Sequence, residues 1–270
     1  MDFLEGLLLL NPQGTIALAE RGLMVQAVLF MLIVAVPVYI LLFFFARHYR
    51  ENNKKAVYKP NWAHAKIDEL IWWAIPFEIV LILGALTWSS THELDPRKPI
   101  DGAPPLVIEV VALDWKWLFI YPEQKIATVN YVRMPVNQPV RFEITADAPM
   151  NSFWIPALGG QIYAMTGMKT ALNLEAQEIG TFSGLSANYS GEGFAHMKFI
   201  AEATTQNEFD SWVDEVRSRG GILDEQSYKR LAETNIARDV AYYGNVSDNL
   251  FDSIIAKFST WENTMHAHYP

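Results

Sequence analysis

A continuous run of uncharged residues, 22–46, constrains this chain more than any other feature. It is rich in Leu, Val, Ile and Phe, and it is long enough to cross a hydrocarbon core of roughly 30 Å. A second run, residues 70–89, carries one charge, Glu78, and also predicts a span. Pro37 and Pro76 lie inside these runs, which indicates neighbouring helices that satisfy the freed carbonyls. The sequence therefore predicts a transmembrane hairpin.

Basic residues are concentrated between the two spans, whereas residues 1–21 contain only Arg21. The basic residues of the loop 47–69 are Arg47, Arg50, Lys54, Lys55, Lys59 and Lys66. By the positive-inside rule this loop is cytoplasmic. We therefore expect residues 1–21 and 90–270, and with them both termini, on the opposite face, which in a bacterium is the periplasmic side of the inner membrane.

The chain contains no cysteine. This excludes a disulfide framework, a thiolate nucleophile, Cys-ligated zinc, iron–sulfur clusters, covalent c-type haem, thiolate copper sites and an N-terminal lipoprotein Cys. Asp2 and Glu5 replace the positive start of a secretory signal, so residues 1–10 do not predict one.

A formal net charge of −9 argues against nucleic-acid binding. No nucleophile–base pattern or phosphate-binding loop appears, and we expect no catalysis by this chain alone.

Residues 106–203 are organised as short β-branched and aromatic runs separated by Pro, Gly and Asn. The runs are LVIEVVAL, WKWLFIY, IATVNYV, PVRFEITA, NSFWIP, KTALNLEA and FAHMKFIAEA. Runs of this length and spacing predict an antiparallel all-β sandwich. The Pro-rich segment 90–105 is the predicted linker from the membrane hairpin. Helical periodicity returns only after Thr204, so residues 204–270 predict a small C-terminal helical region.

Several motifs resemble subunit II of the haem-copper terminal oxidases, and more narrowly subunit II of the cytochrome bo-type ubiquinol oxidases. They are NPQG, KPNWAH, WAIP, LTW, VVALDWKWLFIYPEQKIATVN, MNSFWIP, GGQIYAMTGMKT and SANYSGEGFAHMKF, and they cover almost the whole length. The resemblance implies a cupredoxin-like fold for residues 106–203. It also implies a large haem-copper subunit I as partner, which would hold the haems and copper and bind the quinol, together with other oxidase subunits and the lipid bilayer.

The copper-bearing branch of this family resembles the chain least at its binuclear copper centre. There the ligands are an early His and the motif C-x-E-x-C-x-x-x-H-x-x-M. The corresponding positions here are Asn151, Ser186, Asn188, Ser190, Phe194 and Met197. Only the methionine remains, and a thioether without bridging thiolates cannot hold the two copper ions. The resemblance therefore implies no cofactor in this chain.

Three further residues, Glu69, Trp115 and Trp117, have roles implied by the resemblance, and a fourth, Glu78, is singled out by its place inside a predicted span. Glu69 matches a glutamate at the mouth of a proton-uptake channel, although a first-turn acid favoured by the helix dipole is the alternative. Glu78, an intramembrane carboxylate, is expected to face protein or water. Trp115 and Trp117 match an aromatic stretch that passes electrons in copper-bearing relatives; without copper, we expect them to pack the sandwich or seal a subunit interface.

The combined hypothesis is a non-redox subunit II of a proton-pumping quinol oxidase that reduces oxygen to water. The alternative is a stand-alone, membrane-tethered cupredoxin-like adaptor or copper-binding protein. The two Pro-containing spans and the intramembrane carboxylate argue against it, because a simple tether needs one helix and no buried charge.

Overall fold

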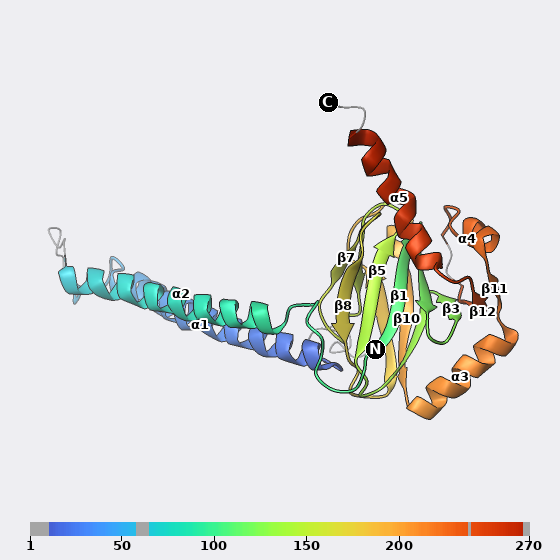
Figure 1. The fold of residues 1–270 in the computed structure, drawn as a ribbon. Coiled ribbons are helices and arrows are strands. Elements are labelled where there is room, and N and C mark those ends of the chain that lie inside the picture. Colours follow the sequence, from blue (N-terminus) through green and yellow to red (C-terminus); the bar gives the residue numbers. More distant parts are fainter. Residues whose placement is uncertain (1–10, 58–64, 237–238, 267–270) are drawn as a thin grey trace. The chain divides into compact units, whose positions relative to one another are not determined.

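The computed structural model describes residues 11–57, 65–236 and 239–266 (Figure 1). The chain divides into two compact units, one formed by Gly22–Asp95 and the other by Met1–Arg21 with Pro96–Pro270. The KPNWAH motif of the loop and the segment 1–10 lie outside the described residues. Each unit is described below by itself.

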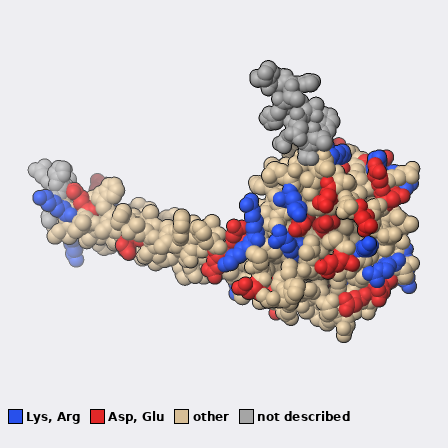
Figure 2. All heavy atoms as spheres, viewed as in Figure 1, with Lys and Arg blue, Asp and Glu red and all other residues tan. Residues whose placement is uncertain are grey.

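The first unit is built from the part of helix α1 (Thr15–His48) that follows Arg21 and from helix α2 (Lys66–Glu93). At 34 and 28 residues, both are long and apolar enough to cross a membrane. The apolar runs 22–46 and 70–89 lie inside them, and Pro37 and Pro76 are accommodated in helix interiors. Figure 2 shows charged side chains near the ends of this unit and few along its middle. The apolar side chains of these helices are mostly exposed within this chain, as expected for surfaces that contact lipid or other subunits.

The second unit is a β-sandwich of two sheets. The seven-stranded sheet has the order β11-β12-β3-β2-β1-β5-β8, and the five-stranded sheet has the order β4-β10-β9-β6-β7. The strands of the larger sheet are β1 (Leu106–Leu113), β2 (Lys116–Tyr121), β3 (Ile126–Val129), β5 (Val140–Ala146), β8 (Thr170–Leu174), β11 (Gly221–Leu223) and β12 (Ala241–Val246). Those of the smaller sheet are β4 (Tyr131–Pro135), β6 (Asn151–Trp154), β7 (Ile162–Ala164), β9 (Gly180–Ser186) and β10 (Lys198–Thr204). This is the predicted two-layer, cupredoxin-like arrangement.

The sheets are mixed, and the expectation of purely antiparallel pairing was wrong. Strands β1 and β5 pair in parallel, as do β4 with β10 and β11 with β12. The first two pairs join strands that are distant in sequence, and the intervening chain visits the opposite sheet before it returns. A long crossover of this kind lets a strand return in the same direction, which a tight hairpin cannot do.

The region after Thr204 contains more than helices. Helices α3 (Gln206–Arg219), α4 (Glu225–Leu231) and α5 (Leu250–His266) are present, but β11 and β12 also extend the larger sheet. The sequence did not predict these strands, because β11 has only three residues and Gly244 interrupts the apolar pattern of β12. Strand β9, GTFSGLS, was also missed because its composition is typical of a loop. Its Gly184 is required, since an added Cβ would lie 2.1 Å from the Phe199 ring.

The main core lies between the two sheets and is closed at one edge by α3. Residues Ile108, Val110 and Ala112 of β1 point into it, and Phe209 and Trp212 reach it from α3. Helix α3 begins with a capping box, in which Thr205 and Glu208 satisfy each other's backbone N–H groups. This local signal and the apolar stripe of α3 together fix where the helix starts and which face it buries.

A second apolar cluster lies on the outer face of the seven-stranded sheet. Val111 and Leu113 of β1 face outward and pack with Tyr228 of α4 and with Phe251 and Ile254 of α5. Strand β1 is therefore covered on both faces over its last four residues, all of which are buried. This explains why its sequence is a nearly continuous apolar run instead of a strict alternation.

The N-terminal segment docks onto the sandwich through backbone hydrogen bonds. Gln13 donates its N–H to the Ala157 carbonyl at 2.8 Å and accepts from Gln177 at 2.9 Å. Between these contacts, Gly14 forms an isolated bridge with Ala176. A Cβ at Gly14 would lie 2.6 Å from the Leu158 carbonyl oxygen, so only glycine fits. The NPQG motif thus attaches the N-terminal segment to the sandwich, and Ala17 adds a hydrogen bond from its N–H to the Leu158 carbonyl at 3.1 Å.

Candidate functional site

The six positions of the copper motif come together at one end of the sandwich. Asn151 opens β6, and Ser186 closes β9. The other four follow in the β9–β10 connection: Asn188, Ser190, Phe194 in the short 3-10 helix Phe194–His196, and Met197 directly before β10. The pairing of β9 with β6 and β10 brings these segments together.

Hydrogen bonds within the protein occupy the polar groups at the first three positions. The Ser186 hydroxyl donates to Asn151 Oδ1 at 2.9 Å, and both residues are buried. Asn151 Nδ2 donates to the Pro149 carbonyl at 2.7 Å, and Asn188 Nδ2 donates to the Met150 carbonyl at 2.9 Å. These bonds use donors and acceptors in the place where a metal would need free lone pairs.

The remaining three positions are packed. The Met197 side chain is 1% exposed and belongs to the main core. Phe194 packs edge-on against Tyr189, with 5.7 Å between ring centroids. Ser190 is buried, and its hydroxyl has no hydrogen-bond partner among the residues that the structure describes. The donor set is therefore one thioether with amides and hydroxyls, which does not fit a thiolate-bridged copper pair.

Trp115 covers the β9–β10 connection. Its indole Nε1 donates to the Ser190 carbonyl at 3.0 Å. The ring lies directly over Gly193, where an added Cβ would approach to 2.3 Å, and it also limits the space at Gly191. Trp115 thereby holds the connection that carries four of the six copper-motif positions.

Trp117 lies elsewhere, inside the sandwich. It is fully buried and packs edge-on against Phe153 and Phe199, at centroid distances of 5.3 and 5.9 Å. The two tryptophans therefore have different surroundings: Trp115 contacts the loop of the copper-motif positions, and Trp117 fills the core. Such aromatic contacts stabilise a core beyond their buried area.

Lys116, between the two tryptophans, is a residue that sequence analysis missed. Its Nζ is buried under the loop after α4, where it donates to the Glu233 carbonyl at 2.9 Å and to Asn235 Oδ1 at 2.7 Å. Burial lowers the pKa of Lys116, although Asp114 and Glu233 oppose the shift. The sequence signal was a lone Lys in the apolar run WKWLFIY, because a buried charge in such a strand needs a dedicated partner.

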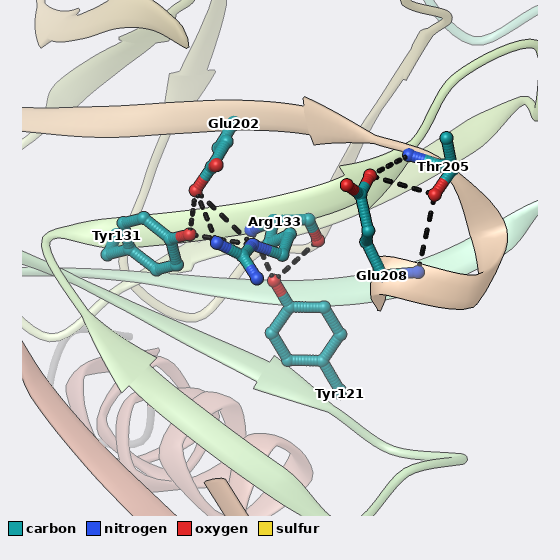
Figure 3. A network of polar contacts seen from close by, with 6 residues as sticks. All are labelled: Tyr121, Tyr131, Arg133, Glu202, Thr205 and Glu208. Atoms are coloured by element: carbon teal, nitrogen blue, oxygen red, sulfur yellow. Dashed lines mark hydrogen bonds and ion pairs between the residues drawn. The ribbon is translucent and has the colours of Figure 1, made fainter. Parts of the chain in front are cut away.

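A polar network joins β2, β4 and β10 next to α3 (Figure 3). Arg133 donates through Nη2 to Glu202 at 2.7 Å, and the Tyr131 hydroxyl donates to the same carboxylate. The Arg133 guanidinium also lies 5.3 Å from the ring centroid of Trp212. Burial raises the pKa of Glu202, but hydrogen bonds from Tyr131 and Arg133 outweigh it and leave the pKa below its usual value. This network fastens α3 to the sandwich.

The two membrane-segment carboxylates lie on α2. Glu69 is in the first turn of the helix, beside Asp68, and Glu78 lies in its interior. A separation of nine residues is two and a half helical turns, so the two carboxylates lie on nearly opposite faces. Glu78 is exposed within this chain, and Glu69 is partly exposed.

Within the described parts of the chain, no group of three or more His, Cys, Asp or Glu residues is arranged to hold a metal ion. The end of the sandwich that carries the six copper-motif positions therefore remains the candidate functional site, and we consider it as a binding surface.

Two families of known sequence match this chain. Residues 118–204 match the family described as cytochrome c oxidase subunit II, periplasmic domain, and residues 217–260 match the COX Aromatic Rich Motif. Among solved structures, the periplasmic domain of subunit II of cytochrome oxidase from Bradyrhizobium japonicum is similar at 23% identity and a TM-score of 0.42, over 44% of this chain and 99% of that one.

Full-length relatives are much more similar. The cytochrome bo(3) ubiquinol oxidase subunit 2 of Pseudomonas putida is 49% identical over 96% of this chain and 83% of its own length. The ubiquinol oxidase subunit 2 of Acetobacter aceti is 46% identical over 93% and 82%. The quinol oxidase subunit 2 of Bacillus cereus is 40% identical over 85% and 80%. The chain therefore belongs to the subunit 2 family of the haem-copper ubiquinol oxidases.

Proposed function

We propose that this chain is a non-redox subunit of a proton-pumping terminal oxidase, which oxidises ubiquinol and reduces oxygen to water. In this proposal, the large subunit I binds the quinol, the haems and the copper. The present chain carries no electron and supports the assembly and proton uptake of the complex. The names of its relatives support a quinol oxidase, and the copper-motif end supports the lack of a redox role.

The observation that carries the proposal is that hydrogen-bonded and packed side chains occupy the copper-motif positions. Ser186 and Ser190 stand where the bridging thiolates would be, and a hydroxyl cannot bridge two copper ions as a thiolate does. The Ser186–Asn151 hydrogen bond and the burial of Met197 stabilise this arrangement without a metal. Electrons from a soluble donor would then have no acceptor in this chain.

The same end of the sandwich is the proposed docking surface for subunit I. Tyr189 is 76% exposed and Met150 is 44% exposed, and the Asn188–Met150 hydrogen bond joins the two segments that carry them. Aromatic residues and Met are enriched in the cores of protein interfaces. Trp115 holds the loop that presents Tyr189, so the role of Trp115 would be to stabilise the conformation of this surface.

Glu69 is proposed to line the mouth of the proton-uptake path on the cytoplasmic side. It lies at the start of α2, next to the basic loop that the positive-inside rule assigns to the cytoplasm. Glu78 is proposed to face a partner helix, because lipid would penalise an exposed carboxylate. With the loop inside, the sandwich and both termini would be periplasmic.

The test is a reduced-minus-oxidised optical spectrum of the complex purified in detergent from its own membrane, with copper counted per complex. We expect haem absorption, one copper, and oxygen uptake driven by ubiquinol but not by reduced cytochrome c. Two additional coppers, or rapid uptake with cytochrome c, would contradict the non-redox role. A haem-free preparation would favour the stand-alone cupredoxin-like adaptor.

A further inference from the structure

A pair of acidic side chains, Glu109 and Glu143, lies on the outer face of the seven-stranded sheet, and Glu109 adjoins the start of helix α5. In the parallel register of β1 and β5, Glu109 lies opposite Glu143. Glu109 alternates with Ile108 and Val110, which point into the main core, so its own side chain points to the face that α5 covers. Phe251 and Ile254 anchor α5 on that face.

Glu109 shares a cavity with the first turn of α5. The cavity has a volume of about 290 Å³, and its walls include Glu109 of β1, Asp248 and Asp252. Asp252 belongs to α5 itself, so two carboxylates from different elements approach each other where the helix meets the sheet.

The cations around this cavity are already paired with other acids. Arg141 and Lys169 both bind Glu143, at 3.1 and 3.0 Å. From the turn before β3, Lys125 pairs with Asp248 at 3.3 Å. On α5, the Lys257 ammonium bonds to Asp147 at 2.6 Å. In the described residues, no hydrogen bond or ion pair to the Glu109 carboxylate is found.

The electrostatic surroundings therefore favour the neutral form of Glu109. Burial is the largest cause, and Asp252 and Glu143 add to it, whereas Lys169 opposes them. Together they raise the pKa of Glu109 from 4.5 to about 7. An ionised Glu109 would be partly desolvated and would repel Asp252 across the contact between helix and sheet.

We propose that Glu109 is a pH-sensitive latch for the C-terminal helix. The protonated side chain permits α5 to pack tightly on the outer face of the sheet, and ionisation loosens the helix at its first turns. This role concerns the position of α5 and is independent of the electron and proton chemistry proposed above.

The sign of the pH dependence follows from proton binding. With α5 docked, Glu109 holds a proton up to about pH 7, whereas with α5 released it would ionise near the ordinary value of 4.5. The docked state therefore binds more protons between these values, and docking weakens as the pH rises through this window. Above the window the loss is complete and the dependence ends.

The experiment is hydrogen–deuterium exchange with mass spectrometry on the detergent-purified oxidase complex, reading the peptide that covers residues 250–258. After correction for the intrinsic exchange rate, we expect exchange in this peptide to rise about tenfold from pH 5 to pH 7.5, since solvent screening reduces the full effect. In Glu109→Gln, we expect strong protection at both pH values.

Two further variants make the result specific. Glu123→Gln removes an exposed carboxylate from the β2–β3 turn and should keep the wild-type pH dependence. Asp252→Asn removes the facing charge and should reduce that dependence. Equal corrected exchange at both pH values in the wild type, or an unchanged pH dependence in Glu109→Gln, would overturn the proposal.

Discussion

Single residues decide the shape of the copper-motif end, and Gly193 is the clearest of them. Its φ of −85° suits any residue, so the need for glycine there is purely steric. The Trp115 ring fills the volume that a Cβ would use, at 2.3 Å. The contact between Trp115 and Gly193 therefore gives this tryptophan a structural role at this place.

We predict that Gly193→Ala displaces the Trp115 ring and destabilises the sandwich by about 1–3 kcal/mol, the usual cost of overpacking. The measurement is the thermal unfolding midpoint of the purified complex, followed by tryptophan fluorescence. Gly221→Ala is the matched control, because the nearest atom to its added Cβ is 3.8 Å away. Equal midpoints for the two variants would show that Trp115 does not restrict Gly193.

The Arg133–Glu202 pair makes a prediction about pH. Because hydrogen bonds hold the pKa of Glu202 below its usual value of 4.5, the stabilisation is present above that value and is lost as the pH falls through the lower folded-state pKa. Glu202→Gln should therefore be less stable than the wild type at pH 7. The difference should shrink towards pH 3 in denaturant unfolding of the purified protein. Glu178→Gln, at an exposed position, should show no such difference.

At the scale of elements, the C-terminal region depends on the sandwich for its placement. Asp147, with a side chain only 4% exposed, accepts from the Tyr228 hydroxyl of α4 at 2.8 Å and binds Lys257 of α5 at 2.6 Å. One carboxylate at the end of β5 thus positions two helices. Burial and the neighbouring Asp147 raise the pKa of Tyr228, so the hydroxyl keeps its proton and its donor role.

We predict that Asp147→Ala loosens α4 and α5 together, at a cost of about 1–3 kcal/mol, because it removes the acceptor of the buried Tyr228 hydroxyl and the ion-pair partner of the exposed Lys257 ammonium. Hydrogen exchange in peptides covering 225–231 and 250–258 is the measurement, and both should lose protection. Asp214→Ala removes an exposed carboxylate of α3 and is the control. If only one helix responded, Asp147 would not be their common anchor.

At the scale of the whole molecule, the sequence predicted the two long helices and the two-layer sandwich, because runs of apolar residues and turn residues report on burial directly. It did not predict the parallel pairing of β1 with β5 or the sheet extension by β12, since pairing partners depend on distant contacts. The run IATVNYV was one segment in sequence, but Asn130 adopts a left-handed φ of 56° and divides it between β3 and β4, which belong to different sheets.

The candidate site was also predicted only in part from the sequence. The lack of Cys and His at the copper-motif positions was visible in the residue types alone. The hydrogen bond that joins Ser186 to Asn151 was not, because it links two strands that are far apart in sequence. Lys116 was missed for a similar reason, since its acceptors lie in a loop more than a hundred residues later.

The role proposed for Glu69 is a property of the whole complex, and it is testable there. Glu69→Gln should slow steady-state oxygen uptake with ubiquinol roughly tenfold. The loss is smaller than for an essential acid–base group, because water can replace part of the relay at a channel mouth. The haem spectrum and the subunit composition should stay unchanged, since a partly exposed first-turn residue contributes little to folding.

Asp68→Asn, one position earlier and exposed, is the matched control and should retain full turnover. Equal activity in both variants would reduce Glu69 to a first-turn acid that only complements the helix dipole.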